Sequence, residues 1–138
     1  MANFVFKDAH FTINTEDLSD HVESLELNFT SESVDDTCMG DDDRNYLVGL
    51  NDGTITCTFK QDFAASETDA TMWSIYNGQT AVAFAIRKSD TDSVGATNPE
   101  YQGNCILTDY SALTGSVGDS ATAPVTFQIT GSKTRATS

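Results

Sequence analysis

The chain has 138 residues, enough for one domain with its own hydrophobic core, and we expect a single domain over 1–138. Its 7 basic residues against 21 acidic residues give a formal net charge of −14, which argues against direct binding to nucleic acid or to an anionic membrane surface. No apolar run approaches the ~20 residues of a membrane-spanning helix, and the first residues lack the pattern of a signal peptide, so we expect a protein kept in a cytoplasm with no membrane contact.

The first third of the chain predicts short extended segments and one longer strand. Residues 3–7 and 10–14 read as extended pieces, and a polar turn at 15–20 holds Leu18 as its one candidate for burial. Apolar and polar residues alternate over 21–30, which is typical of a strand with one buried face. We therefore expect Leu25, Leu27 and Phe29 to face inward.

Residues 31–52 are the least regular segment, and they predict a long acidic loop or a splayed hairpin. Connections in compact domains are mostly ~4–6 residues, so a segment of this length is usually functional or disordered. This one is too apolar for disorder, and its apolar residues are candidates for contact with another chain. These candidates are Val34, Met39, Tyr46, Leu47, Val48 and Leu50.

The centre of the chain predicts a strand, a helix and a second strand. Over 53–63, Ile55, Cys57 and Phe59 alternate with threonines, and over 79–88 three larger apolar residues alternate with the alanines at 81, 83 and 85. We expect the helix between them to pack on this small alanine face.

The helix itself is predicted over 66–77. Ser66 is the expected N-cap, and Asn77-Gly78 is the expected stop because glycine tolerates the left-handed conformation. Its apolar stripe is expected to be Ala70, Met72, Trp73 and Tyr76, with Trp73 as a core anchor.

The last part of the chain predicts strands at 100–110 and 124–130 and a polar tail at 131–138. Val125, Phe127 and Ile129 are expected to face inward. The sum is a mainly β fold of about seven strands with one flanking α-helix, arranged as a β-sandwich or a partly open barrel.

A search for catalytic and metal-binding patterns finds little. Asp41, Asp43 and Asn45 have the first spacings of a calcium loop, but Tyr46 and Asp52 occupy the positions of its glycine and glutamate. A loose cation site or a solvated, partner-facing acidic loop are the two interpretations that remain. We find no phosphate loop, nucleophile elbow or His/Cys metal spacing, and we expect no enzyme activity and no cofactor.

Two further patterns concern the thiols and the threonines. Cys57 and Cys105 lie in apolar strand patterns and are expected to be reduced core residues. The threonine-rich strand faces are either ordinary solvated surface, or a sheet that lines a water-filled space or continues into neighbouring subunits at its edges.

Motifs along most of the chain occur in a familiar order. They are Phe-Val-Phe-Lys-Asp-Ala (4–9), Asp-Leu-Ser-Asp-His-Val (17–22), Val-Asp-Asp-Thr-Cys-Met-Gly-Asp (34–41), Tyr-Leu-Val-Gly-Leu-Asn-Asp-Gly-Thr-Ile-Thr (46–56), Gln-Asp-Phe-Ala-Ala (61–65), Asp-Ala-Thr-Met-Trp (69–73), Ala-Thr-Asn-Pro-Glu-Tyr (96–101) and Thr-Ala-Pro-Val-Thr-Phe-Gln-Ile-Thr-Gly (122–131). In this order the chain resembles the major tail (tail tube) proteins of long-tailed, non-contractile bacteriophages and related gene transfer agents.

The resemblance implies a structural virion protein without catalytic residues. Its subunits would form six-membered rings that stack into a tube, with inner sheets joined into a lumen wall through which DNA passes without specific binding. Expected partners are further copies of the chain and the tail tip, tape measure and terminator proteins. The chain would assemble in the host bacterial cytoplasm and then lie in the mature tail.

An acidic lumen would let DNA slide without sticking, because like charges repel. Candidates for that potential are Glu23, Glu26, Asp35, Asp36, Asp41, Asp42 and Asp43. Two alternatives stay open. One is a related head–tail or tail protein (terminator, distal tail or decoration protein), and the other is a stand-alone acidic β-sandwich that binds a small ligand or cation.

Overall fold

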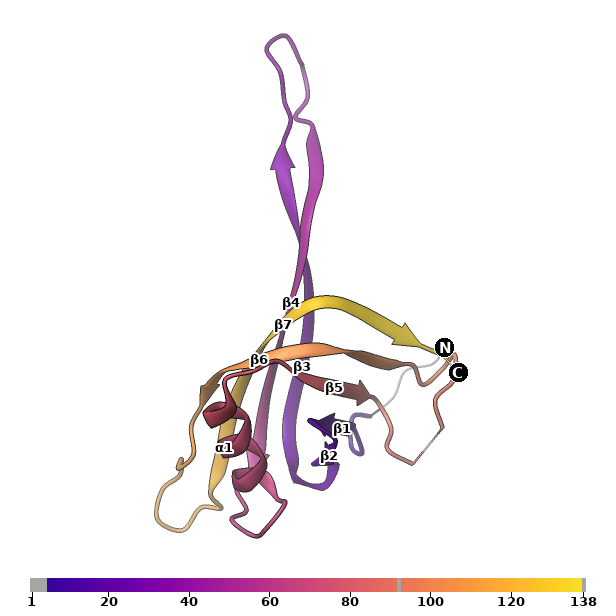
Figure 1. The fold of residues 1–138 in the computed structure, drawn as a ribbon. Helices are drawn as coiled ribbons and strands as arrows, with labels where there is room; N and C mark the ends of the chain where they lie inside the picture. The colour runs from indigo at the N-terminus through magenta and orange to yellow at the C-terminus, as the bar shows by residue number, and fades with distance from the viewer. Residues whose placement is uncertain (1–4, 92, 138) are drawn as a thin grey trace.

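The computed structural model describes residues 5–91 and 93–137, and its strands form one antiparallel sheet (Figure 1). In chain order the elements are β1 (His10–Ile13), β2 (Glu16–Asp17), the short 3-10 helix η1 (Ser19–His21), β3 (Val22–Asp35), β4 (Tyr46–Lys60), α1 (Thr68–Gly78), β5 (Val82–Arg87), β6 (Glu100–Tyr110) and β7 (Thr122–Ala136). The strand order is β2-β1-β5-β6-β7-β4-β3.

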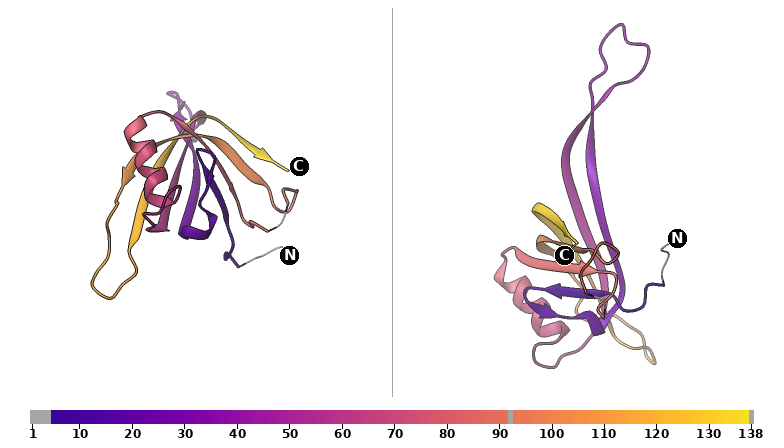
Figure 2. Two further views of the ribbon diagram at one scale, coloured as in Figure 1. Left: turned by 60° about the horizontal axis from the view of Figure 1, so that its bottom comes forward. Right: turned by 90° about the vertical axis from the view of Figure 1, so that its right-hand side faces the viewer.

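The sheet begins at β2 and ends at β3, so it does not close on itself. Its strands fan out and curl, and α1 lies along one side of the curled sheet (Figure 2). The predicted mainly β fold with seven strands and one helix is confirmed, and the single curled sheet corresponds to the partly open barrel and not to the sandwich.

Alternate residues of the strands form one hydrophobic core on the inner face of the sheet. Phe11, Phe59 and Phe127 are completely or almost completely buried, with the ring of Phe11 5.4 Å from that of Phe59 and 6.4 Å from that of Phe127. The residues predicted to face inward on β4 and β7 are buried, and so is Leu18. On β3, Leu25 and Leu27 are half-buried against the core, but the prediction for Phe29 is wrong because its side chain is 43% exposed. Strict alternation in sequence therefore located most of this core.

Both predicted core cysteines are buried free thiols. Burial disfavours the charged thiolate and raises the pKa of Cys57 and of Cys105 to about 12. Cys38, by contrast, is exposed.

The helix differs from its prediction at both ends and on its buried face. The left-handed residue that ends it is Gln79 and not Gly78. The helix begins at Thr68 after Glu67, and Ser66 is not the N-cap but has a left-handed φ of 63°. Its buried residues are Thr68, Thr71, Met72 and Ile75, which follow the i, i+3, i+4, i+7 spacing of one helix face. Trp73 is 56% exposed, so the prediction of a tryptophan core anchor is wrong.

The position of α1 on the sheet also corrects an expectation. The alanines at 81 and 83 are exposed, whereas Val82, Phe84 and Ile86 of the opposite face share the core with Met72 and Ile75 of the helix. The helix therefore covers the face of larger side chains, because these bury more apolar surface than alanines do. Tyr110 of β6 joins the helix to the sheet by donating a hydrogen bond to Asp69, at 2.7 Å.

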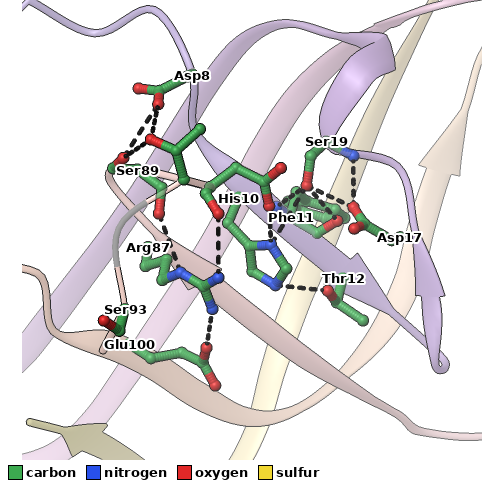
Figure 3. Close-up of polar contacts among 12 residues, drawn as sticks. Asp8, His10, Phe11, Thr12, Asp17, Ser19, Arg87, Ser89, Ser93 and Glu100 are labelled. Atoms are coloured by element: carbon green, nitrogen blue, oxygen red, sulfur yellow. Dashed lines mark hydrogen bonds and ion pairs between the residues drawn. The ribbon is translucent and has the colours of Figure 1, made fainter. Parts of the chain in front are cut away.

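A polar network fastens β1 to the segment after β5 (Figure 3). The imidazole of His10 pairs with Asp90 at 2.6 Å, and Arg87 pairs with Glu100 at 2.7 Å. The hydroxyl of Ser89 donates to Asp8 at 3.0 Å. The ladder between β1 and β5 has four residue pairs, and these polar contacts add to it in holding β1 beside β5.

Candidate assembly surface

The segment 31–52 is a β-hairpin that extends beyond the sheet. Its strands pair with each other from Thr30–Asp52 to Asp35–Tyr46, with a bulge between Ser31 and Ser33, and only residues 36–45 form a loop. We call residues 30–52 the arm and residues 36–45 its tip. The arm stands far out from the body of the molecule in Figure 1 and in the right-hand view of Figure 2.

The base of the arm is fixed where β4 separates from β7. Pairing between these strands ends at Thr54–Gln128, and beyond it β4 pairs with β3 alone. The Gln128 amide donates to the Asp52 carboxylate at 2.6 Å and to the Gly53 carbonyl at 2.9 Å. A Cβ at Gly53 would lie 2.9 Å from the Ile129 side chain and 3.1 Å from the Asn28 carbonyl oxygen, so a larger residue would require these neighbours to shift.

The tip is organised by its own acidic side chains. The Asp41 carboxylate accepts hydrogen bonds from the Cys38 amide at 2.8 Å and from the Asn45 side chain at 3.2 Å. Asp35 accepts from the Thr37 amide at 2.9 Å and pairs with Arg44 at 3.1 Å. Hydrogen bonding to Thr37 is the main cause that lowers the pKa of Asp35. These carboxylates therefore act as turn-stabilising acceptors.

Groups of potential metal ligands occur elsewhere in the part of the chain that the structure describes. Asp20, His21 and Glu67 form one group, and His10, Asp17 and Asp90 form the other. In both groups the histidine forms ion pairs with the neighbouring carboxylates, and these ion pairs account for the short distances. Within residues 5–91 and 93–137, the spacing of Asp41, Asp43 and Asn45 does not produce such a group.

All six residues predicted as contact candidates lie on the arm and are exposed. Alternation places Tyr46 and Val48 on one side of the arm, whereas Leu47 lies on the other side beside its partner Val34. The bulge between Ser31 and Ser33 interrupts this alternation before Leu50. Val48 and Leu50 are 81% and 80% exposed, and Met39 at the tip is fully exposed. The arm thus presents apolar side chains on both sides, which a monomer leaves in contact with water.

The edge of the sheet runs along the arm. β3 pairs with β4 on one side only, so its other side presents unpaired backbone groups over a strand of 14 residues. Such an edge is a template for pairing with a further strand.

The face of the sheet opposite the core is polar and mostly uncharged. Thr56 of β4 lies across from Glu26 of β3 and from Thr126 of β7, and Asp109 of β6 also lies across from Thr126. Lys60, at the end of this face, is 3.5 Å from Glu23. Of the seven acidic residues predicted to contribute to a lumen potential, Glu26 therefore lies on this face, Glu23 is paired with a cation, and the other five are at or beside the tip.

Sequence reasoning did not identify two further exposed groups. The first is the aromatic pair Trp73–Tyr76 on α1, with ring centroids 5.5 Å apart. The i, i+7 spacing of Thr68 and Ile75 marks the buried helix face, and from it the exposure of the aromatic pair could have been predicted. The second brings Tyr101 and the cations of the last strand beside Phe29. No local pattern signals that group, because it joins residues far apart in the chain.

No helix among the described residues is long and apolar enough to cross a membrane.

No family model matches the chain, and no curated protein matches its sequence. Among solved structures, a chain of the virion of a native gene transfer agent particle has a TM-score of 0.78 at 17% identity, covering 96% of this chain and 98% of that chain. A chain of the tail of an empty gene transfer agent particle, refined with C6 symmetry, has a TM-score of 0.68 at 18% identity, covering 83% of this chain and 81% of that chain.

A chain of the SPP1 tail tube has a TM-score of 0.77 at 8% identity, covering 99% of this chain and 80% of that chain. Identities this low carry information about the fold and not about individual residues. Over almost its whole length, the chain shares its fold with chains of a gene transfer agent particle and of the SPP1 tail tube.

Proposed function

We propose that this chain is a structural subunit of the tail tube of a bacteriophage or gene transfer agent. Copies would form six-membered rings that stack into a conduit for DNA delivery. The observation that carries the proposal is the whole-chain likeness to a chain of a gene transfer agent virion and to a chain of the SPP1 tail tube, at TM-scores of 0.78 and 0.77. The number six follows the C6 symmetry of the tail whose chain has this fold.

The exposed arm supports self-assembly. Apolar residues on both of its sides would be buried if the arm lay between two neighbouring copies, and burial of each large side chain contributes roughly 1.5–3 kcal/mol. The unpaired edge of β3 would extend the sheet into the next copy. We assign the role of subunit contacts to the six apolar residues of the arm.

The polar face of the sheet is the proposed lumen wall. It carries threonines with Glu26 and Asp109, and the whole chain has a net charge of −14. Such a wall would repel phosphates and hold DNA without specific contacts. A map of the tube in which this face lies outside, or in which the lumen is basic, would contradict the assignment.

The role is mechanical and not catalytic, and the chain would bind further copies of itself together with tail tip, tape measure and terminator proteins. Assembly would take place in the cytoplasm of the host bacterium, and the mature location would be the particle tail.

Negative-stain electron microscopy and sedimentation of the purified protein test the proposal. We expect hollow tubes with a regular axial repeat. Isolated rings would favour a terminator-like role instead. Monomers alone, over a range of protein and salt concentrations and with a tail tip supplied as a nucleus, would contradict tube formation.

The arm is tested separately by Leu47→Lys with Leu50→Lys. Both side chains are exposed, so the variant should keep its fold by circular dichroism but should not assemble, because lysines cannot be buried without cost between neighbours. Ala65→Lys, at an exposed position outside the arm, is the matched control and should assemble as the unmodified chain does. Normal tubes from the arm variant would refute the contact role.

A further inference from the structure

A trough with basic walls lies at the base of the arm. Two adjoining hollows of about 380 and 310 Å³ share Phe29 and Tyr101, whose ring centroids are 5.8 Å apart. The sheet curls so far that β3 faces β5 and β6 across the second hollow, which is also lined by Leu25 and Leu27. We define the basic trough by the two aromatic residues and four cations, namely Phe29, Tyr101, Arg87, Lys88, Lys133 and Arg135.

The charge of this trough is unusual for the chain. Four of its 7 basic residues line the two hollows, although the net charge is −14. Arg87 is engaged by Glu100, but Lys133 and Arg135 have no ion pair within the part of the chain that the structure describes. The Asp52 carboxylate in the wall already accepts hydrogen bonds from Gln128 and Gly53. The two unpaired cations therefore remain available to an acidic partner.

The tip of the arm has the complementary chemistry. Asp35 and the tip contain five acidic residues and Arg44, a net charge of −5 + 1 = −4. Met39, fully exposed, stands among these acids. A thioether packs well on aromatic rings, and the trough offers two of them.

The tip cannot enter the trough of its own chain. Both the trough and the root of the arm involve Phe29 to Ser31, and the paired strands then lead away from the body. Five residue steps from Thr30 to Asp35 at ~3.3 Å each place the tip at least ~16 Å beyond its root. The occupant must come from another copy.

We propose that the tip of one copy docks in the basic trough of a second copy, with its carboxylates against Lys133 and Arg135 and Met39 against Phe29 and Tyr101. This inference rests on the proposed self-assembly and names the surface that receives the arm. Tip and trough are different patches, so the contact is head to tail and generates a closed ring or a continuing stack. The opposite charges would also set the register between copies.

Cys38 gives a direct test, because it lies in the tip and is the one exposed thiol of the chain's three cysteines. A maleimide-benzophenone attached to Cys38 is irradiated in assemblies of mixed ¹⁴N- and ¹⁵N-labelled protein, and the products are mapped by mass spectrometry. We expect cross-links between differently labelled copies at peptides holding Tyr101 or residues 133–135. Cross-links to another surface, or only within one copy, would overturn the docking site.

Charge reversal gives an independent test. Asp42→Lys with Asp43→Lys, and Lys133→Asp with Arg135→Asp, should each lower the pelleted fraction at least about tenfold, whereas all four substitutions in one chain should restore it. Lys7→Asp, at an exposed cation outside the trough, is the control and should assemble normally. Circular dichroism confirms that each variant folds.

The outcomes separate the two proposals. If the unmodified protein forms neither rings nor tubes, the proposed function fails. If it assembles and both reversed variants assemble equally well, the docking site alone is wrong. If the Lys133/Arg135 variant assembles normally but loses binding of a DNA fragment in a mobility-shift assay, the trough receives phosphates and the docking inference is overturned.

Discussion

At the scale of single residues, His21 is held through both of its ring nitrogens. One ring nitrogen contacts Asp20 at 2.8 Å, and the other contacts Asp62 at 3.0 Å and Glu67 at 3.2 Å. Burial alone lowers the pKa of His21, but hydrogen bonds to Asp62 and Asp20 outweigh it, so the pKa is raised above 6.5. The protonated ring holds η1 against the connection between β4 and α1.

This pKa predicts a pH dependence of stability. Because the folded pKa is raised, the stabilisation is fully present below pH 6.5 and is lost as pH rises through the folded value. The melting temperature of the unmodified chain should fall over that range, and His21→Gln should lose this component of the slope. Thermal melts followed by circular dichroism check it. An identical slope in both proteins would show that the His21 contacts contribute nothing.

The three thiols should differ in reactivity. Burial and pKa values of about 12 leave Cys57 and Cys105 without accessible thiolate, whereas Cys38 is exposed. Titration with Ellman's reagent should detect one thiol in the folded monomer and three after denaturation. Cys38→Ser should abolish the native signal. Rapid reaction of Cys57 or Cys105 in the folded Cys38→Ser variant would mean that the core opens more readily than its packing indicates.

At the scale of elements, α1 joins the sheet through an apolar stripe and through polar contacts. In one of these contacts, the Thr68 hydroxyl donates to the Lys60 carbonyl of β4 at 3.2 Å. Tyr110 donates to Asp69 at 2.7 Å and accepts from the Gln61 amide at 3.2 Å. Burial is the first cause that raises the pKa of Tyr110, to about 12, and the nearby Asp69 charge adds to it. The phenol therefore stays protonated as a donor to the helix.

Removing this hydroxyl should loosen the helix. Tyr110→Phe should lower the free energy of unfolding by about 1 kcal/mol, the net value of a typical hydrogen bond. The melting temperature would then fall by roughly 2–5 °C. Tyr46→Phe is the control, because within the described residues its hydroxyl forms no hydrogen bond. Equal melting temperatures for the two variants would show that the Asp69 contact does not stabilise α1.

The arm is the element whose form the sequence left open between a loop and a hairpin. Its apolar residues and its exposure were predictable from composition, because a small core has no room for them. The point at which the arm leaves the sheet was not predictable from composition, because it depends on where β7 stops pairing with β4 and on the contacts of Gln128 and Gly53.

At the scale of the whole molecule, stability should be unevenly distributed. Residues 54–59 of β4 pair with strands on both sides, and Ile55, Cys57 and Phe59 among them are buried in the core. Residues 46–52 pair with β3 alone and expose apolar side chains. Local opening is easiest where few buried contacts oppose it. The arm of an isolated copy is therefore the first part expected to open.

Hydrogen exchange measures this difference. In the monomer, amides of residues 30–35 and 46–52 should exchange much faster than those of residues 54–60, and assembly should slow the arm selectively. The loop at 111–121 is an internal reference outside the arm. Unchanged arm exchange after assembly would contradict its burial between copies.

The sequence by itself located the central part of most strands and most of the core, because alternation is a local property of an extended chain. It was wrong at the C-terminus, where a polar tail was predicted from residue 131 and β7 instead continues to Ala136. It placed Ile55, Phe59 and Phe127 correctly, yet it misassigned the helix face. There the side chains of Trp73 and Tyr76 are more apolar than the threonines of the buried stripe, and local hydrophobicity does not reveal which face meets the sheet.

Only the tertiary structure decided the surfaces. The strand order puts β3 at an edge, the curl of the sheet brings Phe29 to Tyr101, and the extension of β7 to Ala136 carries Lys133 and Arg135 to the same trough. Each depends on pairing between distant segments, which no local period encodes. Composition therefore indicated that apolar residues would be exposed for contact with other chains, whereas long-range strand pairing determined the surfaces on which they lie.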